Sequence, residues 1–445
     1  MKINLRIISL LLCAIILVGL APSAMGEGGE RVKISYLMWG TPEEYTAVVA
    51  TIERFNALQD RIEVEARMVP WETYMATLNA MAMEGDLPDT AMMKEDAVLQ
   101  WANQGMLADI SGMYDEDESK PLDSLVFRFD GMPVAYSAAN EVLLLYYNRG
   151  MFDAAGVAYP PSSAEEAWSW DEFVAAAKKL TFDKEGNTPN DEGFDPARIV
   201  QYGCLVENLT WQLEVWALSN GGGFYSPDGS QVTIDKPQTV EAIQRVADLH
   251  LKDHVAPLSM GDTDDGVQRS LLIGLCAMTT NGAWNVGTCL PTARDEGIDY
   301  GVAVLPYMKE RVTICTGGPN VVFSQSKYPE EAMEWLKWYA REENSWGLIE
   351  TGIWMPILDS WYTDETLTRQ WVQNPNFPPY DEYKAAVVDY ARDYSRSTSW
   401  YYVDNTVDFN DALGAALGDV WTGVKTAEQA IAEELAALKA AFEGK

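Results

Sequence analysis

An α/β fold is the class that the sequence predicts, because segments patterned as strands and segments patterned as helices alternate along the chain. Val32–Met38 is rich in residues that favour strands, and Ile62–Met68 alternates apolar with mostly charged side chains. Between these two segments, apolar residues recur at helical spacing from Tyr45 to Phe55. A strand, a helix and a second strand in close succession predict a right-handed βαβ unit.

The first helix carries its own start signal. Thr41 stands as the N-cap, Pro42 occupies the first helical position and Glu44 completes a capping box. Another helix is expected from near Trp71 to the turn that begins at Gly85. The later helix starts are the capping box of Ser169 and Glu172 before Phe173–Leu180, then Pro237 and Pro329.

The remaining elements continue the alternation. Short strands are expected over Leu275–Thr280 and Tyr300–Leu305, and a final helix has an apolar stripe that runs from Ile431 to Phe442. Thr181–Pro196 is rich in Asp, Asn, Gly and Pro, which is typical of a loop rather than of a linker between domains. We find no internal repeat.

The N-terminus has the pattern of an export signal. Lys2 and Arg6 precede the apolar run Ile7–Leu20, and small residues follow, so Met1–Gly26 is expected to be a cleaved signal peptide. The run is short for a membrane span, which needs about 20 residues. Cys13 lacks the small residue before it that a lipoprotein signal requires, so no lipid anchor is predicted. The protein is therefore expected in the periplasm.

The charge of the chain excludes one class of partner. Sixty-seven acidic residues face 32 basic ones, a net charge of −35 at pH 7. Such a surface repels nucleic acid and anionic lipid. The acidity does not indicate disorder, because 16 tryptophans and a hydrophobic content of 47% supply ample core. No segment after the signal peptide is apolar for long enough to span a bilayer.

Four cysteines remain after cleavage of the signal peptide. An oxidising compartment permits one or two disulfides, and four cysteines allow three pairings. No CxxC motif is present, so the cysteine spacing gives no support to a metal or redox centre. The sequence does not choose between bridges and buried thiols. The four residues are Cys204, Cys276, Cys289 and Cys315.

Signatures of catalysis are scarce, and we expect no enzyme, no metal and no cofactor. His250 and His254 are the only histidines, and their spacing of four residues could present both on one helix face, but no third ligand accompanies them. The loop Asp262–Gly266 resembles a calcium loop but lacks the distal glutamate. No P-loop, GxGxxG or GxSxG motif occurs. A secreted carbohydrate-active hydrolase, which needs only two carboxylates, is the alternative that stays open.

The informative residues are aromatic. Six tryptophans lie where we expect turns or strand ends, and sugar rings stack their C–H faces on such side chains. Carboxylates such as Asp96 and Glu141 would accept hydrogen bonds from sugar hydroxyls. For any single tryptophan the alternative is packing in the core. The six residues are Trp39, Trp211, Trp216, Trp284, Trp354 and Trp400.

An ordered series of loose motifs resembles extracellular solute-binding proteins of family 1, the group of the maltodextrin-binding and glycerol-3-phosphate-binding proteins. The resemblance runs from about Val32 to Phe442. The segment GLCAMTTNGAW, residues 274–284, is similar to the family's G-x-x-A-M-x-x-N-G-x-W signature. The other matching segments are Gly85–Asp89, Glu141–Arg149, Ser169–Glu172, Gly301–Pro306 and the pair Gly317-Gly318.

The resemblance implies a two-lobed periplasmic binding protein fold of type II, with three crossover segments and a central ligand cleft. The crossovers are expected near Ala139–Leu143, Gly301–Pro306 and Leu358–Phe377. Lobe 1 would then comprise about 27–139 and 307–360, and lobe 2 about 144–300 and 365–445. Ligands of open α/β sheets bind beyond the carboxyl ends of strands, and pockets favour domain interfaces, which agrees with this expectation.

The resemblance also assigns the expected site. Asp96 and Glu141 match acceptors of sugar hydroxyls, Trp284 and Trp400 match stacking aromatics, and Gly317 and Gly318 match a pair that lets backbone approach the ligand. Trp354 falls where relatives place a cleft side chain, and Trp39 is expected there from its position at the end of a strand. Two departures, Thr41-Pro42 and Met93, argue against maltodextrin itself. The acidic chain has no evident Arg/Lys cluster, which argues against a phosphate-bearing ligand.

The function that the resemblance implies is that of the substrate-binding component of an ABC importer. A carbohydrate would hold two lobes shut by hinge closure, and the closed monomer would deliver it to membrane permease subunits. A sensory or adhesive module without transport is a third interpretation.

Overall fold

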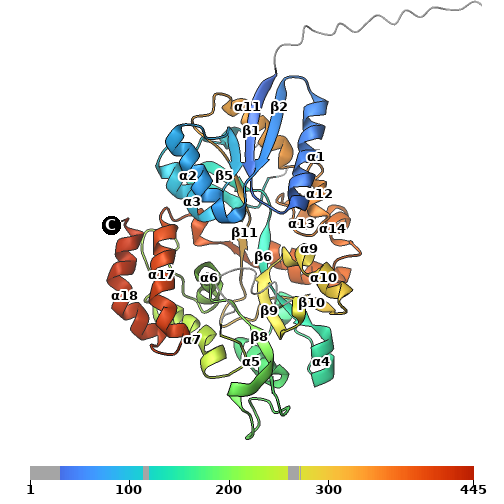
Figure 1. The fold of residues 1–445 in the computed structure, drawn as a ribbon, viewed down its shortest axis with the longest axis vertical. Helices are drawn as coiled ribbons and strands as arrows, with labels where there is room; N and C mark the ends of the chain where they lie inside the picture. Colours follow the sequence, from blue (N-terminus) through green and yellow to red (C-terminus); the bar gives the residue numbers. More distant parts are fainter. Residues whose placement is uncertain (1–30, 114–119, 259–269, 271, 445) are drawn as a thin grey trace, which may run out of the picture.

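The computed structural model describes residues 31–113, 120–258, 270 and 272–444. The predicted signal peptide and the Asp262–Gly266 loop lie outside the described residues. Two sheets, each flanked by helices, make up the molecule, and they occupy its upper and lower parts in Figure 1. The predicted α/β class and the two-lobed arrangement are confirmed.

The first sheet has six strands in the order β2-β1-β3-β12-β5-β4. β1 pairs in parallel with β2 and β3, whereas β12 pairs antiparallel with β3 and β5. The predicted first unit is therefore a βαβ unit with parallel strands. The strands are β1 (Val32–Met38), β2 (Ile62–Met68), β3 (Thr90–Met92), β4 (Val126–Phe129), β5 (Met132–Ser137) and β12 (Pro319–Val322).

Helices enclose this sheet, and capping explains where the first of them begins. The side chain of Thr41 accepts from the backbone N–H of Glu44, and Glu44 accepts from the backbone N–H of Thr41, so the predicted capping box is confirmed. The helices of this part are α1 (Pro42–Leu58), α2 (Tyr74–Glu84), α3 (Glu95–Asn103), α11 (Pro329–Tyr339) and α12 (Trp346–Ile349).

The second sheet follows the order β13-β11-β6-β9-β8-β7, and β10 also pairs with β6. The central strand β6 is buried along almost its whole length, as expected for a strand covered on both faces. The strands are β6 (Glu141–Asn148), β7 (Phe182–Asp183), β8 (Ile199–Leu205), β9 (Cys276–Gly282), β10 (Tyr300–Ala303), β11 (Thr313–Thr316) and β13 (Ser395–Ser397).

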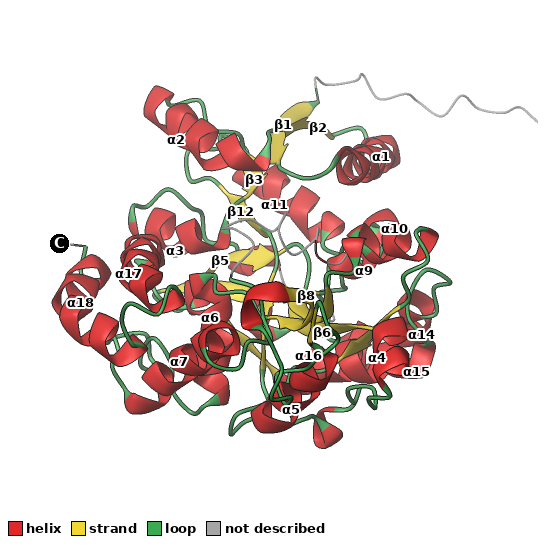
Figure 2. Ribbon diagram, turned by 60° about the horizontal axis from the view of Figure 1, so that its bottom comes forward, coloured by secondary structure: helices red, strands yellow, loops and turns green. Residues whose placement is uncertain are grey.

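Helices cover both faces of the second sheet as well, which Figure 2 shows by the red ribbons around yellow strands. α17 and α18 pack on each other and on α7 at one side of the molecule (Figure 1). The helices are α4 (Arg149–Ala155), α5 (Trp170–Leu180), α6 (Thr210–Ser219), α7 (Pro237–Leu251), α9 (Asn285–Thr288), α10 (Leu290–Asp295), α13 (Ser360–Thr363), α14 (Glu365–Val372), α15 (Tyr380–Tyr383), α16 (Tyr390–Tyr394), α17 (Thr406–Trp421) and α18 (Ala427–Phe442).

The chain first passes between the sheets from β5 to β6, through residues 138–140, close to the expected position. Its second passage differs from the expectation. β11 pairs with β6 of the second sheet and β12 with the first sheet, so the chain passes at Gly317-Gly318 and not at Gly301–Pro306. The position of the second passage depends on pairing between strands that are distant in sequence, and no local sequence pattern indicates that pairing.

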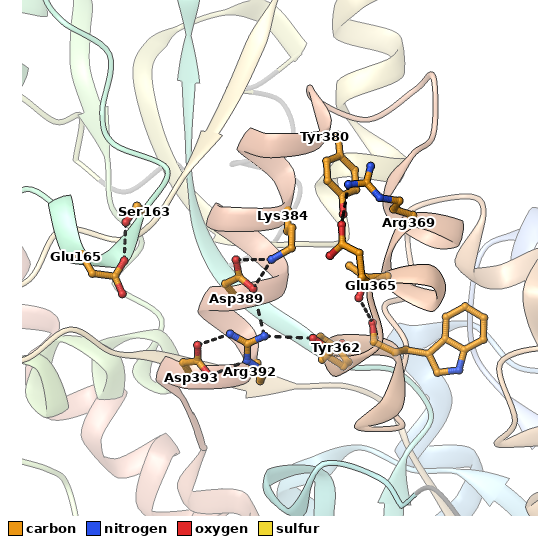
Figure 3. Close-up of polar contacts among 12 residues, drawn as sticks. Ser163, Glu165, Tyr362, Glu365, Arg369, Tyr380, Lys384, Asp389, Arg392 and Asp393 are labelled. Carbon is orange, nitrogen blue, oxygen red and sulfur yellow. Dashed lines mark hydrogen bonds and ion pairs between the residues drawn. The ribbon is translucent and has the colours of Figure 1, made fainter.

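The third passage, residues 350–359 between α12 and α13, lies against the first, because Asn140 and Met355 form a bridge and the N–H of Asn140 donates to the carbonyl of Met355 at 3.1 Å. Ion pairs join successive turns of the helical stretch beyond it. Figure 3 shows Lys384 and Arg392 directed at the carboxylate of Asp389, at 2.9 Å and 3.3 Å. The same Arg392 donates to the carbonyl of Tyr362 at 3.3 Å.

The four described cysteines are free and buried, so the structure chooses thiols over bridges. Burial raises the pKa of Cys276 and of Cys315 to about 12, which leaves both as unreactive thiols at neutral pH. α7 ends at Leu251, so His254 lies beyond the helix and does not share a helical face with His250. None of the helices in the described part of the chain is long and apolar enough to cross a membrane.

Candidate ligand-binding site

An aromatic group lies where the first sheet meets the passages. Trp39 follows β1, and its ring meets Trp71 and Tyr74 edge to face, with centroids 5.1 Å and 4.9 Å away. Trp71 is 46% exposed, whereas Tyr74 is fully buried and its hydroxyl donates to backbone carbonyls. The ammonium of Lys94 lies 3.6 Å from the centroid of Trp71, a cation–π contact. The exposed ring of Trp71 is therefore held in place by its contacts with Trp39 and Lys94.

A second aromatic group belongs to the other sheet. Trp211 lies in the first turn of α6, Trp284 follows β9 and Trp400 lies in a short 3₁₀ helix, Ser399–Tyr401. The ring of Trp211 lies 6.5 Å from that of Trp284 and 5.6 Å from that of Trp400, both at tilted angles. All three rings are partly exposed. Three segments far apart in sequence therefore present one aromatic surface.

The backbone at the passages brings these two groups to the same junction. Trp39 lies against Gly318, where an added Cβ would come within 2.9 Å of its ring. Glu141 and Thr316 are register partners at the adjoining end of the second sheet. One residue further along, the carbonyl of Val142 accepts from the N–H of Ala283, the neighbour of Trp284. Trp39 and Trp284 therefore flank the same short stretch of backbone.

Carboxylates lie beside both groups. Glu95 is buried and its Oε1 accepts from the hydroxyl of Thr316 at 2.5 Å and from the N–H of Gly317 at 2.9 Å. Burial raises the pKa of Glu95 to about 7 despite these bonds. The expected acceptor Asp96 is half-buried in the first turn of α3, and burial raises its pKa too. Glu141 is half-buried at the start of β6.

A buried polar cluster stands behind Trp284. The carboxylate of Glu207 accepts from Gln212 and, at 3.2 Å, from the amide of Asn281. The Oδ1 of Asn281 accepts from Asn285 at 2.7 Å, while the Oδ1 of Asn285 is buried without a hydrogen bond. Asn281 therefore links the loop that carries Trp284 to the buried side chains of Glu207 and Asn285.

The ring of Trp284 depends on the absence of a side chain at Gly282. A Cβ there would meet Cζ3 of Trp284 at 1.8 Å, so the indole lies directly on the glycine. We expect Gly282→Ala to displace the ring and cost about 1–3 kcal/mol of stability. Near-ultraviolet circular dichroism and a denaturant titration would measure both effects.

Gly418→Ala is the matched control, since a Cβ there meets nothing within 4 Å. Alanine in that helix should stabilise by up to about 1 kcal/mol and leave the tryptophan spectrum unchanged. An unchanged spectrum in Gly282→Ala would refute this account of how the ring is held.

The expected glycine pair lies at the second passage. A Cβ at Gly317 would come within 2.0 Å of the carbonyl oxygen of Ala139, and one at Gly318 within 2.4 Å of Cε of Met92. The carbonyl of Gly318 accepts from the N–H of Ala138 at 2.8 Å. In this structure, the absence of side chains at the two glycines lets the first passage and the ring of Trp39 pack closely against the backbone.

Two of the six singled-out tryptophans pack inside the protein. Trp354 is 5% exposed, and its Nε1 donates to Glu44 in the first turn of α1 at 2.8 Å. Trp216 is 2% exposed in the middle of α6 and meets Trp170 edge to face. The expectation that Trp216 lies beside a turn is wrong, because the helix begins earlier, at Thr210.

Sequence reasoning missed Trp71 and Lys94 and left Trp211 out of the expected site. Trp71 was assigned to a helix start, and nothing in the pattern showed that its ring would stay exposed beside Trp39. Lys94 lies two residues before Asp96 in the sequence, yet its contact is with a ring from another element. The one available signal was the run of aromatic residues near strand ends, and Trp211 belonged to it.

A cavity of about 620 Å³ lies elsewhere, between α5 and α7. Two of the cations that line it have anionic partners: Lys178 pairs with Asp253 at 2.8 Å and Arg245 with Asp171 at 3.5 Å. It contains none of the exposed indoles, so we place the site at the junction. Within the described ranges, no group of three or more His, Cys, Asp or Glu residues is arranged to hold a metal ion.

Comparison with known families agrees with this architecture. Residues 50–379 match the model of the bacterial extracellular solute-binding protein family. The chain belongs to this family. Among curated relatives, the maltotriose-binding protein of Pyrococcus abyssi (strain GE5 / Orsay) is 22% identical over 67% of the chain. The matched region spans 60% of that relative's own length.

Solved structures of solute-binding proteins share the fold over nearly the whole chain. The cyclic α-maltosyl-1,6-maltose binding protein from Arthrobacter globiformis superposes with a TM-score of 0.75 at 23% identity, over 94% of this chain and all of that one. The substrate-binding protein Lmo0181 from Listeria monocytogenes, in complex with cycloalternan, gives 0.74 at 21% identity, over 92% and 98%. The two-sheet arrangement is therefore that of an extracellular solute-binding protein.

Proposed function

We propose that this solute-binding protein carries a carbohydrate, held between the two aromatic groups at the junction of the sheets. The observation that supports the proposal most is the set of partly exposed indoles, Trp39 and Trp71 on one side and Trp211, Trp284 and Trp400 on the other. Indole faces stack on the C–H faces of sugar rings, and neighbouring carboxylates accept from the hydroxyls. The names of the similar proteins, binders of maltotriose and cyclic maltosyl sugars, point to the same ligand class.

The mechanism we propose is closure about the three passages. Sugar bound to one aromatic group gains contacts with the other only when the halves approach, so the ligand favours the closed form. Export through the predicted signal peptide and delivery to ABC permease subunits belong to the same proposal. We propose a monomeric carrier without turnover; the family match supports this role and gives no support to the hydrolase alternative.

A thermal-shift screen tests the proposal, because a ligand that binds only the native state raises its melting temperature by mass action. We expect at least one of maltose, maltotriose, mannotriose and cycloalternan to stabilise the protein by about 2–3 kcal/mol at one hundred times its dissociation constant. Glycerol-3-phosphate is the comparison ligand and should have no effect. A shift with glycerol-3-phosphate alone would overturn the carbohydrate assignment, and release of shorter sugars during incubation would overturn the role without turnover.

A further inference from the structure

Each of three segments at the junction is held by a buried glutamate that reaches it from a different element. At the second passage, Glu95 at the start of α3 accepts from the hydroxyl of Thr316 and the N–H of Gly317. This carboxylate belongs to the first sheet's helices, while Thr316 ends a strand of the second sheet. One side chain therefore fixes the point where the chain leaves one half for the other.

The second of these residues is Glu214, in the middle of α6. Its carboxylate accepts from the N–H of Ser399 at 3.1 Å and from the hydroxyl of Ser399 at 3.0 Å. Ser399 opens the 3₁₀ helix that carries Trp400, and the next residue, Tyr401, stacks on Phe127 of the first sheet at 3.8 Å. Glu214 thus ties a helix of the second half to a segment whose far end lies in the first.

The third is Glu342, which follows α11. Its Oε1 accepts from the N–H groups of Ile357 and Leu358 at 3.0 Å and 2.8 Å, where the third passage lies. Its Oε2 is buried and has no hydrogen bond. Burial of a carboxylate disfavours its charged form.

We propose that Glu95, Glu214 and Glu342, the hinge glutamates, are positioning residues that couple closure of the two halves to uptake of protons, so that ligand binds more tightly as the pH falls. The binding part of this inference rests on the proposed function. The geometry behind it does not depend on a ligand. Each of the three carboxyl groups comes from a different part of the chain and accepts hydrogen bonds from a different segment of the junction.

Burial raises the pKa of each hinge glutamate to about 7, which places the change of charge in the neutral range. Few charges face them. The ionisable groups around Glu95 are Lys94, Asp96, Cys315 and Tyr401, those around Glu214 are Tyr225 and Tyr402, and those around Glu342 are Glu343 and Tyr362. Lys94 is the one cation in this set, so neighbouring charge does little to keep the carboxylates ionised.

The direction of the pH effect follows from the coupling between proton binding and closure. Opening the halves at these passages admits water to the buried carboxyl groups, and water favours the charged form, so the closed state binds at least as many protons as the open state. Ligand selects the closed state, and its affinity therefore rises as the pH falls through about 7. A pKa that differs by one unit between the states makes binding about fivefold tighter at pH 6 than at pH 8 for each glutamate.

Hydrogen exchange tests the hinge without any ligand. In the free protein, the amides of Gly317, Ser399, Ile357 and Leu358 should exchange about fivefold more slowly at pH 6 than at pH 8 after correction for intrinsic rates. Glu214→Gln should abolish the pH dependence at Ser399 alone, since glutamine keeps the shape without the charge. Wild-type exchange that is independent of pH at all four amides would overturn the proposal, whether or not the variant folds.

Calorimetry with maltotriose at pH 6, 7 and 8 tests the coupling to binding. We expect tighter binding at pH 6 with proton uptake at pH 7, and a flatter profile in Glu214→Gln. Equal affinity at pH 6 and 8 would overturn the coupling. Absence of binding at every pH, with pH-dependent exchange intact, would count against the proposed ligand and not against the hinge. The control replaces His250 and His254 by asparagine, which tolerates the positive φ at His254, and should keep the pH dependence.

Discussion

Replacing Trp284 by alanine is expected to weaken carbohydrate binding by 30-fold or more while the fold is kept. The ring stands at the end of β9 on Gly282, partly exposed, with Trp211 at 6.5 Å. Buried aromatic anchors of interfaces cost about 2–4 kcal/mol when truncated, and each 1.4 kcal/mol is a tenfold change in affinity. Isothermal titration with the sugar that gives the largest thermal shift measures the loss.

Trp338→Ala is the matched control for this variant. Trp338 is also a partly exposed indole, but it lies on α11 beside Phe55 and beneath Arg54, away from the junction. The Trp338→Ala substitution should lower the melting temperature of the protein and leave its affinity for the sugar unchanged. Equal losses of affinity in the two variants would mean that Trp284 acts through general stability, and the assigned site would then be wrong.

The local elements were predictable from the sequence because their signals are local. The capping boxes at Thr41 and Ser169 place two helix starts correctly, and both are present in full. The alternation in Ile62–Met68 gives a strand of the predicted length. These signals work because a cap or an alternating strand is decided by residues within a few positions of one another.

The junction was less predictable because it is built from partners far apart in the chain. The second passage was expected twelve or so residues too early, since only the pairing of β11 with β6 shows that the chain is still in the second half. Glu95 and Asp96 look alike in the sequence. Because they are neighbours on α3, their side chains point in different directions. The side chain of Glu95 is buried against the second passage, whereas that of Asp96 is half-buried.

The expected tryptophans illustrate the same limit. Trp284 and Trp400 lie in one partly exposed aromatic group, whereas Trp354 is buried and donates to Glu44, a residue 310 positions earlier. A buried indole that donates to a helix-capping glutamate and a partly exposed indole near a strand end have the same sequence signature. Only the packing around each ring separates them.

The largest loss of stability is expected from Gly317→Ala. The new Cβ would lie 2.0 Å from the carbonyl oxygen of Ala139, and both atoms belong to backbone that passes between the halves. A side chain can rotate away from a clash, but two passages cannot separate without breaking the bond between Ala138 and Gly318. We expect a loss of about 3 kcal/mol or more, seen as a lower denaturant midpoint.

Gly112→Ala is the control, because nothing lies within 4 Å of the added Cβ there, and its midpoint should stay within about 0.5 kcal/mol of wild type. Gly318→Ala separates stability from binding. Its nearest clashes are with the flexible end of Met92 and with the ring of Trp39, so the fold should yield at small cost while the ring moves. If Gly317→Ala were as stable as Gly112→Ala, the two passages would not be in the close contact from which the hinge is built.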